Sequence, residues 1–411
     1  MAEKFQAPRG THDVLPQDTS WWHLVRTMEE VTALYGWGRI QTPGFEDTRL
    51  FTRTAGAASD VVHKEMYNFT DRSDRPLTLR PEGTAPICRA YIEHGMHREP
   101  QPVKAYTIAP MYRYGAPGRG RYREHYQLSV EAIGSADPAI DAEIIQLYHE
   151  LLRRLGVTKW ELHLNSIGDA NCRPQYIERL NAWLDEHADV LDDDARHKRE
   201  TSPLQVFDVK TPSVRAALEA APKIGESLCV DCRGHFEAVC RQLDLYGVPY
   251  VIDPTLVRGL DYYSRTTFEF IGPDENANST ICGGGRYDGL VEQIGGPPTP
   301  AIGFGAGLER LQLALENEGI TVQQPGVQVF FVVDDPASRD GVLLALAELR
   351  RAGVSADTDY AGRSFKGQMT QAGRSGAHTV VIVRAGGATI KRDGREEQPV
   401  ALTEVVATLT A

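Results

Sequence analysis

One long stretch constrains the fold more than any other feature of this chain. From about residue 168 to about residue 250 the sequence has charged helical patterns and no strand pattern, whereas strand patterns precede it and resume at Thr266, Phe268 and Phe270. Strands separated in this way belong to one sheet only if the helical stretch is an insertion. We therefore predict a sheet domain that is interrupted by a helical insertion.

A second change of pattern divides the chain near residue 324. Gln324, Pro325 and Gly326 are typical of a linker. Beyond them, strand and helix patterns alternate up to residue 383, which is typical of a small α/β domain with a mixed sheet. We predict a first domain over 1–324, which contains the insertion, and a second domain over 325–411.

The distribution of charge narrows the choice of partners. The formal net charge is −12, which argues against a protein that coats nucleic acid without specificity. Residues 324–411 hold ten Lys and Arg against ten Asp and Glu, so the negative excess lies before them. The tail suits a local contact with phosphates, although a solvated basic face explains its charge equally well. Its basic residues include Arg363, Lys366, Arg374, Arg384, Lys391, Arg392 and Arg395.

Two features indicate a cytoplasmic protein. No apolar run approaches the roughly 20 residues that a membrane-spanning helix needs. Residues 1–4 do not resemble a signal peptide. We expect no membrane association.

The six cysteines are sparse for this length, so we expect free thiols. Only Cys229 and Cys232 have a spacing typical of metal ligands. A closed zinc site needs four ligands, and Cys240 and His235 would have to complete it at poor spacing along a predicted helix. The sequence therefore predicts no zinc.

Two short segments combine arginine, tyrosine and glycine at unusual density. Residues 256–263 contain an arginine and paired tyrosines, and residues 283–290 contain a glycine-rich turn before Arg, Tyr and Asp. Glycine lets backbone N–H groups approach a ligand, and arginine binds carboxylate or phosphate oxygens as a fork. The two segments suit a pocket for a small polar ligand beside a phosphate. For the triple glycine alone, two strands joined by a hairpin is the favoured interpretation, and no Gly-Lys-Ser/Thr follows it, which excludes a P-loop.

Three arginines occupy settings that suit phosphate chemistry. Arg113 ends a predicted strand at the base of a loop rich in Gly, Pro and Arg, Arg258 precedes the paired tyrosines, and Arg310 lies in the first turns of a helix. Reaction at a nucleotide phosphate needs such cations, because negative charge must be neutralised. A single arginine is more often a surface salt-bridge partner, so the prediction depends on all three together.

Six segments together form the most specific pattern in the chain. They are residues 8–16 (Pro-Arg-Gly-Thr-His-Asp-Val-Leu-Pro), 78–84 (Thr-Leu-Arg-Pro-Glu-Gly-Thr), 111–131, 256–263, 283–290 and 305–310 (Gly-Ala-Gly-Leu-Glu-Arg). The second, third and sixth segments resemble the amino-acid loop, motif 2 and motif 3 of class II aminoacyl-tRNA synthetases. The fourth and fifth resemble signatures specific to the bacterial-type histidyl-tRNA synthetases. The resemblance to that family runs from about residue 5 to about residue 384.

The resemblance implies an α+β fold. A class II catalytic core, with a mainly antiparallel sheet flanked by helices, would be interrupted by the insertion at about 168–250. An α/β domain at 325–411 would bind the anticodon. The segment around Pro43 would be motif 1, which builds the dimer interface in this class, so a homodimer is expected.

The resemblance also implies an activity, which is the ATP-dependent attachment of L-histidine to tRNA(His). Histidyl-adenylate would form first with release of pyrophosphate, and the terminal ribose of the tRNA would then take the histidyl group and release AMP. Arg113, Arg258 and Arg310 are the implied catalytic residues. Mg²⁺ bound to ATP is the implied cofactor, with no further metal ligand from the protein.

Recognition of histidine is a hydrogen-bonding problem, because a site with a partner for each ring nitrogen rejects aliphatic competitors. Glu131 and Tyr263 resemble those two partners. A strand-surface carboxylate and core tyrosines remain open as alternatives for these residue types. The implied histidine contacts are Glu82, Gly83, Thr84, Arg113, Gln127, Glu131, Arg258, Tyr262, Tyr263 and Tyr287. The implied ATP contacts are Arg113, Arg121, His125 and Arg310.

The chain departs from the family pattern in motif 2. Class II motif 2 usually reads Arg-x-Glu, but Gly115 and Ala116 follow Arg113 and Tyr114 here. The missing carboxylate normally helps to read adenine and to shape the loop that meets the tRNA. His125 stands where the family usually has a phenylalanine stacked on adenine. We expect altered recognition of the tRNA acceptor end and retained activity.

Two other functions compete with this one. A non-catalytic paralogue that senses histidine as a regulatory subunit would keep the fold and tend to lose the phosphate-binding arginines and the tail domain. An RNA-binding scaffold would need no pocket matched to imidazole. The three arginines and the tail favour the ligase over both.

Overall fold

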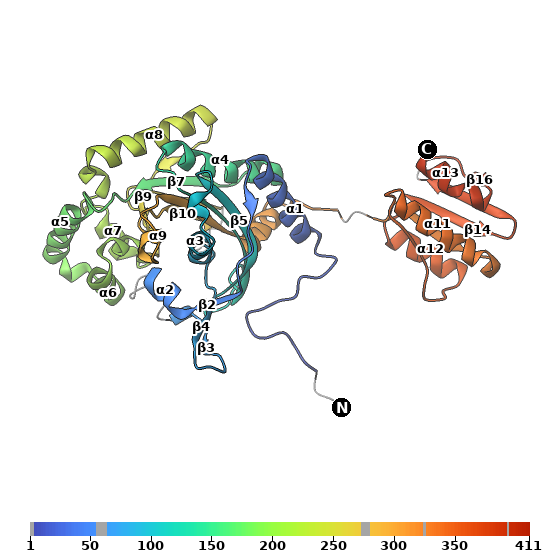
Figure 1. The fold of residues 1–411 in the computed structure, drawn as a ribbon, viewed down its shortest axis with the longest axis horizontal. Helices are drawn as coiled ribbons and strands as arrows, with labels where there is room; N and C mark the ends of the chain where they lie inside the picture. The colour runs from blue at the N-terminus through green and yellow to red at the C-terminus, as the bar shows by residue number, and fades with distance from the viewer. Residues whose placement is uncertain (1–3, 55–63, 273–279, 324–325, 393) are drawn as a thin grey trace. The chain divides into compact units, whose positions relative to one another are not determined.

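The computed structural model describes residues 4–54, 64–272, 280–323, 326–392 and 394–411 (Figure 1). The chain divides into two compact units, Met1–Thr321 and Val322–Ala411. Two of the three predicted linker residues, Gln324 and Pro325, lie outside the described residues. Within the described ranges, no helix has both the length and the apolar character of a membrane span.

A sheet of eight strands forms the centre of the first unit. Neighbouring strands are antiparallel from β5 to β7, and only the two edge strands, β1 and β8, pair in parallel. The predicted mainly antiparallel sheet is thereby confirmed. In spatial order the strands are β1 (Gly38–Arg39), β5 (Val103–Tyr112), β6 (Glu124–Ile133), β11 (Ala301–Gly307), β10 (Thr280–Arg286), β9 (Ser264–Ile271), β7 (Glu161–Ser166) and β8 (Val251–Ile252).

Alternation along the strands separates a packed face from a polar face. On β6, Leu128 and Val130 belong to the main hydrophobic core, whereas Gln127, Ser129 and Glu131 point to the other side. The same period of two places Phe268 of β9 and Phe304 of β11 in the core. It places Gly303 and Gly305 of β11 on the other face, beside Glu131 and Gln127. On the polar face, side chains from four central strands of the sheet can therefore contribute to one site.

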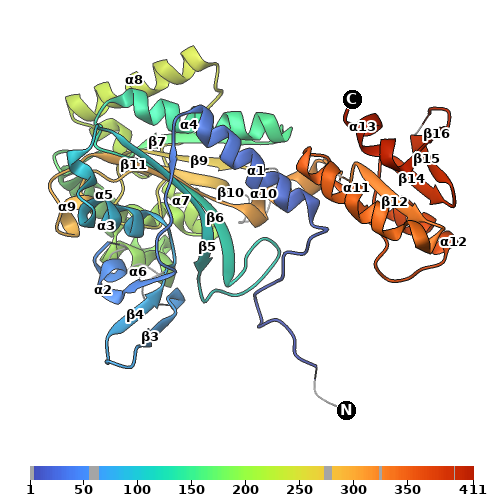
Figure 2. The same ribbon diagram turned by 45° about the vertical axis from the view of Figure 1, so that its right-hand side comes forward.

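Helices of the first unit cover both faces of the sheet, as Figure 2 shows. Buried side chains of α1, α4, α8 and α10 pack on the core face, and those of α3 and α9 pack on the other. The helices of this unit outside the insertion are α1 (Thr19–Leu34), α2 (Thr48–Thr54), α3 (Thr84–Glu93), α4 (Pro138–Leu155), α9 (Leu290–Gln293) and α10 (Leu308–Asn317).

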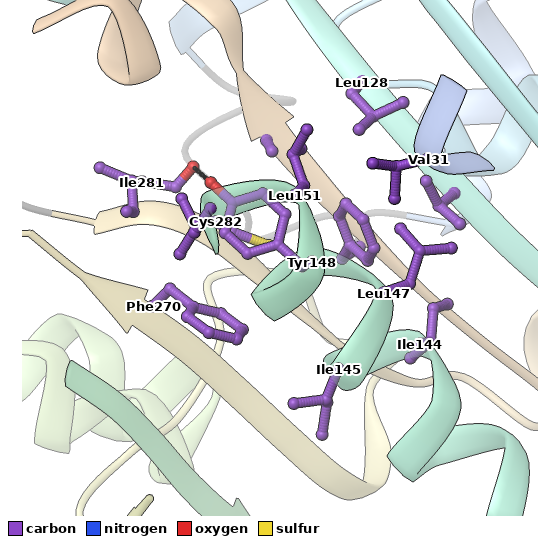
Figure 3. Close-up of a cluster of buried hydrophobic side chains, with 14 of the residues drawn as sticks. Val31, Leu128, Ile144, Ile145, Leu147, Tyr148, Leu151, Phe270, Ile281 and Cys282 are labelled. Carbon is purple, nitrogen blue, oxygen red and sulfur yellow. Dashed lines mark hydrogen bonds between the residues drawn. The ribbon is translucent and has the colours of Figure 1, made fainter. Parts of the chain in front are cut away.

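Helix α4 shows how local sequence positions the core. The Asp137 carboxylate accepts a hydrogen bond from the backbone N–H of Ala139 at 2.9 Å, and Gly156 ends the helix at φ 75°. Its apolar residues at helical spacing, Ile140, Ile144, Tyr148, Leu151 and Leu155, are all buried. Figure 3 shows Tyr148 within this cluster, where its hydroxyl donates to the backbone carbonyl of Ile281 at 3.0 Å. The hydrogen bond ties the helix to the strand that leads into the triple glycine.

The predicted helical insertion is confirmed, because residues 167–250 form helices and turns without a strand. The insertion has a small hydrophobic core of its own, which includes Tyr176, Leu180 and Val206. Val257 of the arginine–tyrosine segment packs against that core. The longer helices are α5 (Arg173–Glu186), α6 (Asp193–Thr201), α7 (Pro212–Leu218) and α8 (Val230–Tyr246).

A three-stranded antiparallel sheet contains the first residues of the segment 78–84. Its strands are β2 (Phe45–Asp47), β4 (Pro76–Leu79) and β3 (Asn68–Thr70), in the order β2-β4-β3. Arg80, which is almost fully buried, donates to the backbone carbonyls of Thr42 and Pro110 at 3.0 Å and 2.9 Å. This arginine fixes the loop between the small sheet and the large one.

The second unit is a mixed five-stranded sheet with helices, as predicted for an α/β tail. The strand order is β13-β12-β14-β15-β16, parallel through β14 and antiparallel beyond it. The last two strands and the final helix were not predicted. The elements are β12 (Val329–Val333), α11 (Arg339–Arg351), β13 (Ala356–Thr358), α12 (Phe365–Arg374), β14 (Thr379–Arg384), β15 (Gly387–Arg392), β16 (Gln398–Val400) and α13 (Val405–Thr410).

Candidate active site

One cavity of about 390 Å³ in the first unit gathers most of the predicted site residues. It lies on the polar side of the large sheet and is also bordered by the β5–β6 hairpin and by Lys210 of the insertion. The predicted residues on its wall are Glu82, Thr84, Arg113, Arg121, His125, Gln127, Arg258, Tyr262, Tyr263 and Arg310. Gly83, Glu131 and Tyr287 are packed behind that wall.

Four arginines converge on this cavity. The pKa of Arg310 is lowered by burial first and then by repulsion from Arg121, Arg113 and Arg258. Repulsion among these guanidinium groups agrees with their place on the wall of one cavity. The Arg113 side chain donates to the Pro81 carbonyl at 2.8 Å, and that of Arg310 donates to the Thr280 carbonyl. Because backbone carbonyls hold these two side chains, their positive charge is available to a ligand.

Arg258 differs, because it pairs with a carboxylate. Its guanidinium contacts Glu269 of β9 and lies over the ring of Tyr263, 5.8 Å from the centroid. A Cβ on Gly283 would lie 2.5 Å from its terminal nitrogens, so only glycine leaves room for this side chain. An anionic ligand would compete with Glu269 for Arg258.

The triple glycine corrects one sequence-based prediction. Gly283, Gly284 and Gly285 are not a turn but lie inside β10. A Cβ on any of them would lie less than 3 Å from an atom of Arg258 or of a neighbouring strand. Arg286, which follows them, is fully buried and points away from the cavity to the carbonyl of Ser135 and to Asp141. The glycines therefore make space for side chains and do not bind a phosphate through a loop.

The polar floor beside the cavity is built around Glu131. One oxygen of this fully buried carboxylate accepts from the Thr84 hydroxyl at 2.7 Å, and the other accepts from the Tyr287 hydroxyl. Burial raises the pKa of Glu131 to about 8. A Cβ on Gly303 of β11 would lie 1.7 Å from the second oxygen. Glu131 thus contacts the cavity through Thr84 in this structure, and a proton on its carboxyl is favoured near neutral pH.

Glu82 caps the start of α3 beneath the same cavity. Its carboxylate accepts from the backbone N–H groups of Thr84 and Ala85, the latter at 2.9 Å. Burial raises its pKa. Residue 83, between Glu82 and Thr84, needs to be glycine, because a Cβ there would lie 2.4 Å from the Ser129 hydroxyl. The amino-acid loop is therefore held both by its helix and by β6.

Aromatic rings and an amide complete the wall. The rings of Tyr262 and Tyr263 are 4.7 Å apart, and Tyr262 meets Tyr287 edge-on at 5.8 Å. The Gln127 amide donates to the Ser129 hydroxyl at 2.9 Å and occupies space that a Cβ on Gly305 would block. This part of the cavity matches a small, flat, polar ligand in size and in hydrogen-bonding groups.

His125 lies between the arginines and is neutral. Burial first, and then the charges of Arg113 and Arg310, lower its pKa to about 3. A neutral imidazole at this position can stack on an aromatic base without adding charge to a strongly cationic wall.

Sequence reasoning missed three charged residues of the cavity, namely Glu65, Lys210 and Glu309. Glu309 accepts a hydrogen bond from the Tyr126 backbone N–H at 2.9 Å, and burial raises its pKa to about 7. Glu65 approaches the position that motif 2 leaves without a carboxylate, because a Cβ on Gly115 would lie 3.6 Å from its Oε1. Glu309 was visible in the motif beside Arg310, but no local pattern marks the other two.

The zinc arrangement considered from sequence is also corrected. His235 hydrogen-bonds to the buried carboxylate of Asp141 at 2.8 Å, within the network of Arg286. Cys240 lies five residues after His235 on α8, beside Tyr250. Neither residue joins Cys229 and Cys232, whose neighbours are instead Asp169 and Cys172.

Comparison with known proteins decides the family. A profile described as Histidyl-tRNA synthetase matches residues 10–311. The chain belongs to the histidyl-tRNA synthetase family. A curated relative from Moorella thermoacetica, named histidine–tRNA ligase, is 46% identical over 97% of this chain and 96% of its own length.

Solved structures agree with this assignment. The apo histidyl-tRNA synthetase of S. aureus has a TM-score of 0.84, is 35% identical, and matches 99% of this chain and all of its own. An ATP phosphoribosyltransferase regulatory subunit/histidyl-tRNA synthetase from Bacillus halodurans has a TM-score of 0.66 at 23% identity, which shows the fold alone. The class II core with its helical insertion and sheet-containing tail is thereby confirmed.

Proposed function

We propose that this member of the histidyl-tRNA synthetase family is an active ligase that attaches L-histidine to tRNA(His). The observation that carries the proposal is the single cavity in which Arg113, Arg121, Arg258 and Arg310 face one another beside a polar floor. Four cations that repel one another are stabilised by a polyphosphate, and the floor suits an imidazole.

The first step forms histidyl-adenylate. A carboxylate oxygen of histidine attacks the α-phosphorus of ATP, the bond to the β-phosphate oxygen breaks, and pyrophosphate leaves with the electron pair. Arg113 and Arg258 bind the α-phosphate and the carboxylate from two sides, and Arg310 and Arg121 bind the outer phosphates. No nucleophile from the protein is needed, so positioning and charge neutralisation supply the catalysis.

Mg²⁺ fits this site when it arrives with ATP. The cavity wall offers the Glu309 carboxylate, whose raised pKa of about 7 reflects a buried acid that a cation would stabilise. Mg²⁺ is commonly held by one or two carboxylates together with phosphate oxygens, whose charge it neutralises. Glu309 would hold the ion beside the phosphates that Arg310 binds, which replaces the expectation that the protein adds no metal ligand.

The remaining groups select histidine. Glu82 and Thr84, helped by Gln127, bind the ammonium group, Gly83 lets the loop approach it, and Tyr262 and Tyr287 enclose the ring. Glu131 and Tyr263 pair with the ring nitrogens, and His125 stacks on adenine. A competitor without two ring nitrogens leaves buried polar groups unpaired. In such sites this lowers kcat/KM for the competitor by several orders of magnitude.

We infer the second step and the assembly by analogy with the family. The terminal ribose hydroxyl of the tRNA attacks the histidyl carbonyl carbon, AMP leaves, and the hydroxyl proton is released. The second unit, predicted as the domain at 325–411, binds the anticodon in the cytoplasm. A homodimer forms through the motif 1 region, where Phe45 and Phe69 are half-exposed aromatic neighbours 6.0 Å apart.

Pyrophosphate exchange tests the proposal. Exchange into ATP is expected with histidine and almost none with glutamine or tyrosine. Arg258→Ala is expected to lower the rate at least about a hundredfold, the size of effect known for loss of one transition-state donor. Arg179→Ala, an exposed arginine of the insertion with a weak ion pair to Glu226, is the matched control and should be unchanged.

Other outcomes distinguish the competing functions. Histidine binding without exchange would favour the regulatory paralogue, and RNA binding without either would favour a scaffold. Related folds serve both catalysis and regulation, but relatives 44–46% identical over 92–98% of this chain are named histidine–tRNA ligase, which favours the ligase over the regulatory paralogue. The four arginines favour the ligase, since a histidine sensor has no phosphate to bind.

A further inference from the structure

Three cysteines and one aspartate meet outside the active-site cavity. Asp169 and Cys172 follow β7, whereas Cys229 and Cys232 open α8 at the other end of the insertion. One potential ligand atom from each residue lies within 4.8 Å of those of the other three. The Asp169 Oδ1 is 3.6 Å from the Cys172 sulfur and 4.0 Å from the Cys229 sulfur. Four such atoms around one small volume match the ligand number of a structural zinc ion.

We propose that Asp169, Cys172, Cys229 and Cys232 bind one zinc ion that ties the two ends of the helical insertion together. This inference does not depend on the proposed function. It replaces the expectation of no zinc, which considered only ligands close to Cys229 and Cys232 in sequence.

The distances suit a tetrahedral ion after a small contraction. Zinc–sulfur bonds of about 2.3 Å place two tetrahedral sulfurs roughly 3.8 Å apart. Ligand atoms that spread over at most 4.8 Å therefore need to close by about 1 Å. Rotation of the cysteine side chains supplies a movement of this size, so the backbone can stay in place.

The backbone around the cluster favours thiolates. Cys229 is the N-terminal cap of α8, and its sulfur accepts from the backbone N–H of Cys232 at 3.5 Å. The Asp169 backbone N–H similarly donates to the Cys172 sulfur at 3.3 Å. Helix N-termini and backbone donors stabilise the deprotonated sulfur that a metal requires. Two of the three cysteines, Cys172 and Cys229, thus have a backbone donor that favours the thiolate.

The surrounding residues orient the ligands. The Arg265 guanidinium lies 3.4 Å from Asp169 Oδ2, and the other oxygen, Oδ1, faces the sulfurs. Gly168, at φ 63°, is required because a Cβ there would lie 2.6 Å from the Cys172 sulfur. Partners of this kind fix the carboxylate of a metal site from outside the ligand shell.

The site would join segments that are far apart in sequence. The backbone N–H of Arg265 donates to the Gly168 carbonyl at 2.7 Å, and the Arg173 side chain donates to the Tyr263 carbonyl, also at 2.7 Å. An ion at the cluster would therefore link the start of α8 to the strand that follows the paired tyrosines. Loss of the ion should loosen the insertion.

Metal content of the full-length protein tests the inference. Protein purified under reducing conditions without a metal-binding tag, and reconstituted with ZnCl₂, is measured by elemental mass spectrometry. We expect about one zinc per chain in the wild type, and at most a tenth of that in Cys172→Ser and Cys229→Ser. Cys240→Ser, a cysteine of the same helix outside the cluster, is the matched control and should keep the full amount.

Two further measurements protect the test from misfolded variants. X-ray absorption of the zinc in the wild-type protein should show three sulfur neighbours and one oxygen neighbour. A chelator should lower the melting temperature of the wild type and of Cys240→Ser. The inference is overturned by reconstituted wild type without zinc, by zinc bound only through nitrogen and oxygen, by full zinc content in folded Cys229→Ser, or by a disulfide among these cysteines in reduced, freshly purified protein.

Discussion

At the scale of single residues, the active site depends on missing side chains. Gly283, Gly303 and Gly305 leave the space that Arg258, Glu131 and Gln127 fill. Glycine weakens a strand interior, so its presence there marks close approach of another group. Strands β10 and β11 therefore contain glycines of low strand propensity where neighbouring side chains need the space beside the sheet.

Gly303→Ala should damage the histidine pocket. The new Cβ would lie 1.7 Å from the Glu131 carboxylate and 2.8 Å from the Val130 carbonyl, so the carboxylate must leave its place. We expect a loss of about 1–3 kcal/mol in unfolding free energy, as for other overpacked sites. The KM for histidine in pyrophosphate exchange should rise at least tenfold. Gly289→Ala is the control, because nothing lies within 4 Å of its Cβ, and a change in both quantities there would contradict this explanation.

The buried proton of Glu131 predicts a pH optimum for histidine binding. The pKa of Glu131 is about 8 in the free protein, and an imidazole titrates near about 6.5. A complex that shares one proton between the two groups forms without proton exchange only between these values. Above about pH 8 binding must take up a proton, and below about 6.5 it must release one, so affinity falls up to about tenfold per pH unit on each side.

Calorimetric titration of histidine across pH 5.5–9.5 would measure this optimum. Glu131→Gln carries no titrating proton, so its affinity should be lower and its alkaline decline should vanish. An alkaline decline of equal size in the variant would assign the effect to another group, such as the amino group of the ligand.

At the scale of elements, the β5–β6 hairpin is where this chain departs from its family. Its loop reads Arg113-Tyr114-Gly115-Ala116 where class II motif 2 usually reads Arg-x-Glu, and the Arg123 side chain lies over the Tyr114 ring, 3.9 Å from the centroid. A loop that lacks the usual motif 2 carboxylate should depend little on the extra 5′ guanosine of histidine tRNA. We expect kcat/KM for transcripts with and without that guanosine to differ by less than about tenfold, whereas loss of a specific polar contact typically costs more.

Aminoacylation of the two transcripts is the measurement, and pyrophosphate exchange without tRNA is the control for enzyme quality. A strict dependence on the guanosine would show that other parts of the chain read the acceptor end. The departure would then concern adenine alone, for which Glu65 supplies a nearby carboxylate.

Elements with strong local patterns were predictable from sequence. The stripe and caps of α4 specified its ends, and the motif spacing placed Arg113, Arg258 and Arg310 around one cavity. The triple glycine was assigned to a turn, because local propensity does not reveal that Arg258 and the neighbouring strands occupy the space where Cβ atoms would lie. Only tertiary packing gives these glycines a strand conformation.

Contacts between distant segments were not predictable. Lys210 reaches the cavity only because the insertion docks beside residues 256–263, where Gln205 donates to Asp261 at 2.9 Å. Likewise, local spacing grouped Cys229 and Cys232 with His235 and Cys240, whereas the fold brings them to residues that precede α5. Sequence spacing identifies ligands within one element and is silent on pairs that two elements bring together.

At the scale of the whole molecule, two compact units divide the proposed function. All residues on the wall of the active-site cavity belong to the first unit, Met1–Thr321. The second unit, Val322–Ala411, has its own sheet and hydrophobic core. Chemistry on histidine and ATP should therefore need only the first unit, and the second should contribute to tRNA binding.

Truncation after residue 321 separates these roles. Histidine-dependent pyrophosphate exchange should stay within about fivefold of the full-length rate, because no cavity residue is lost, whereas kcat/KM for aminoacylation should fall at least about a hundredfold, the scale at which a second linked contact raises affinity. Circular dichroism of the truncated protein is the control for folding. A parallel loss of both activities in a folded truncation would mean that the tail supports adenylate formation itself. Because ATP and histidine have no contact with the tail in the proposed mechanism, such a result would overturn the division of labour and not the ligase activity.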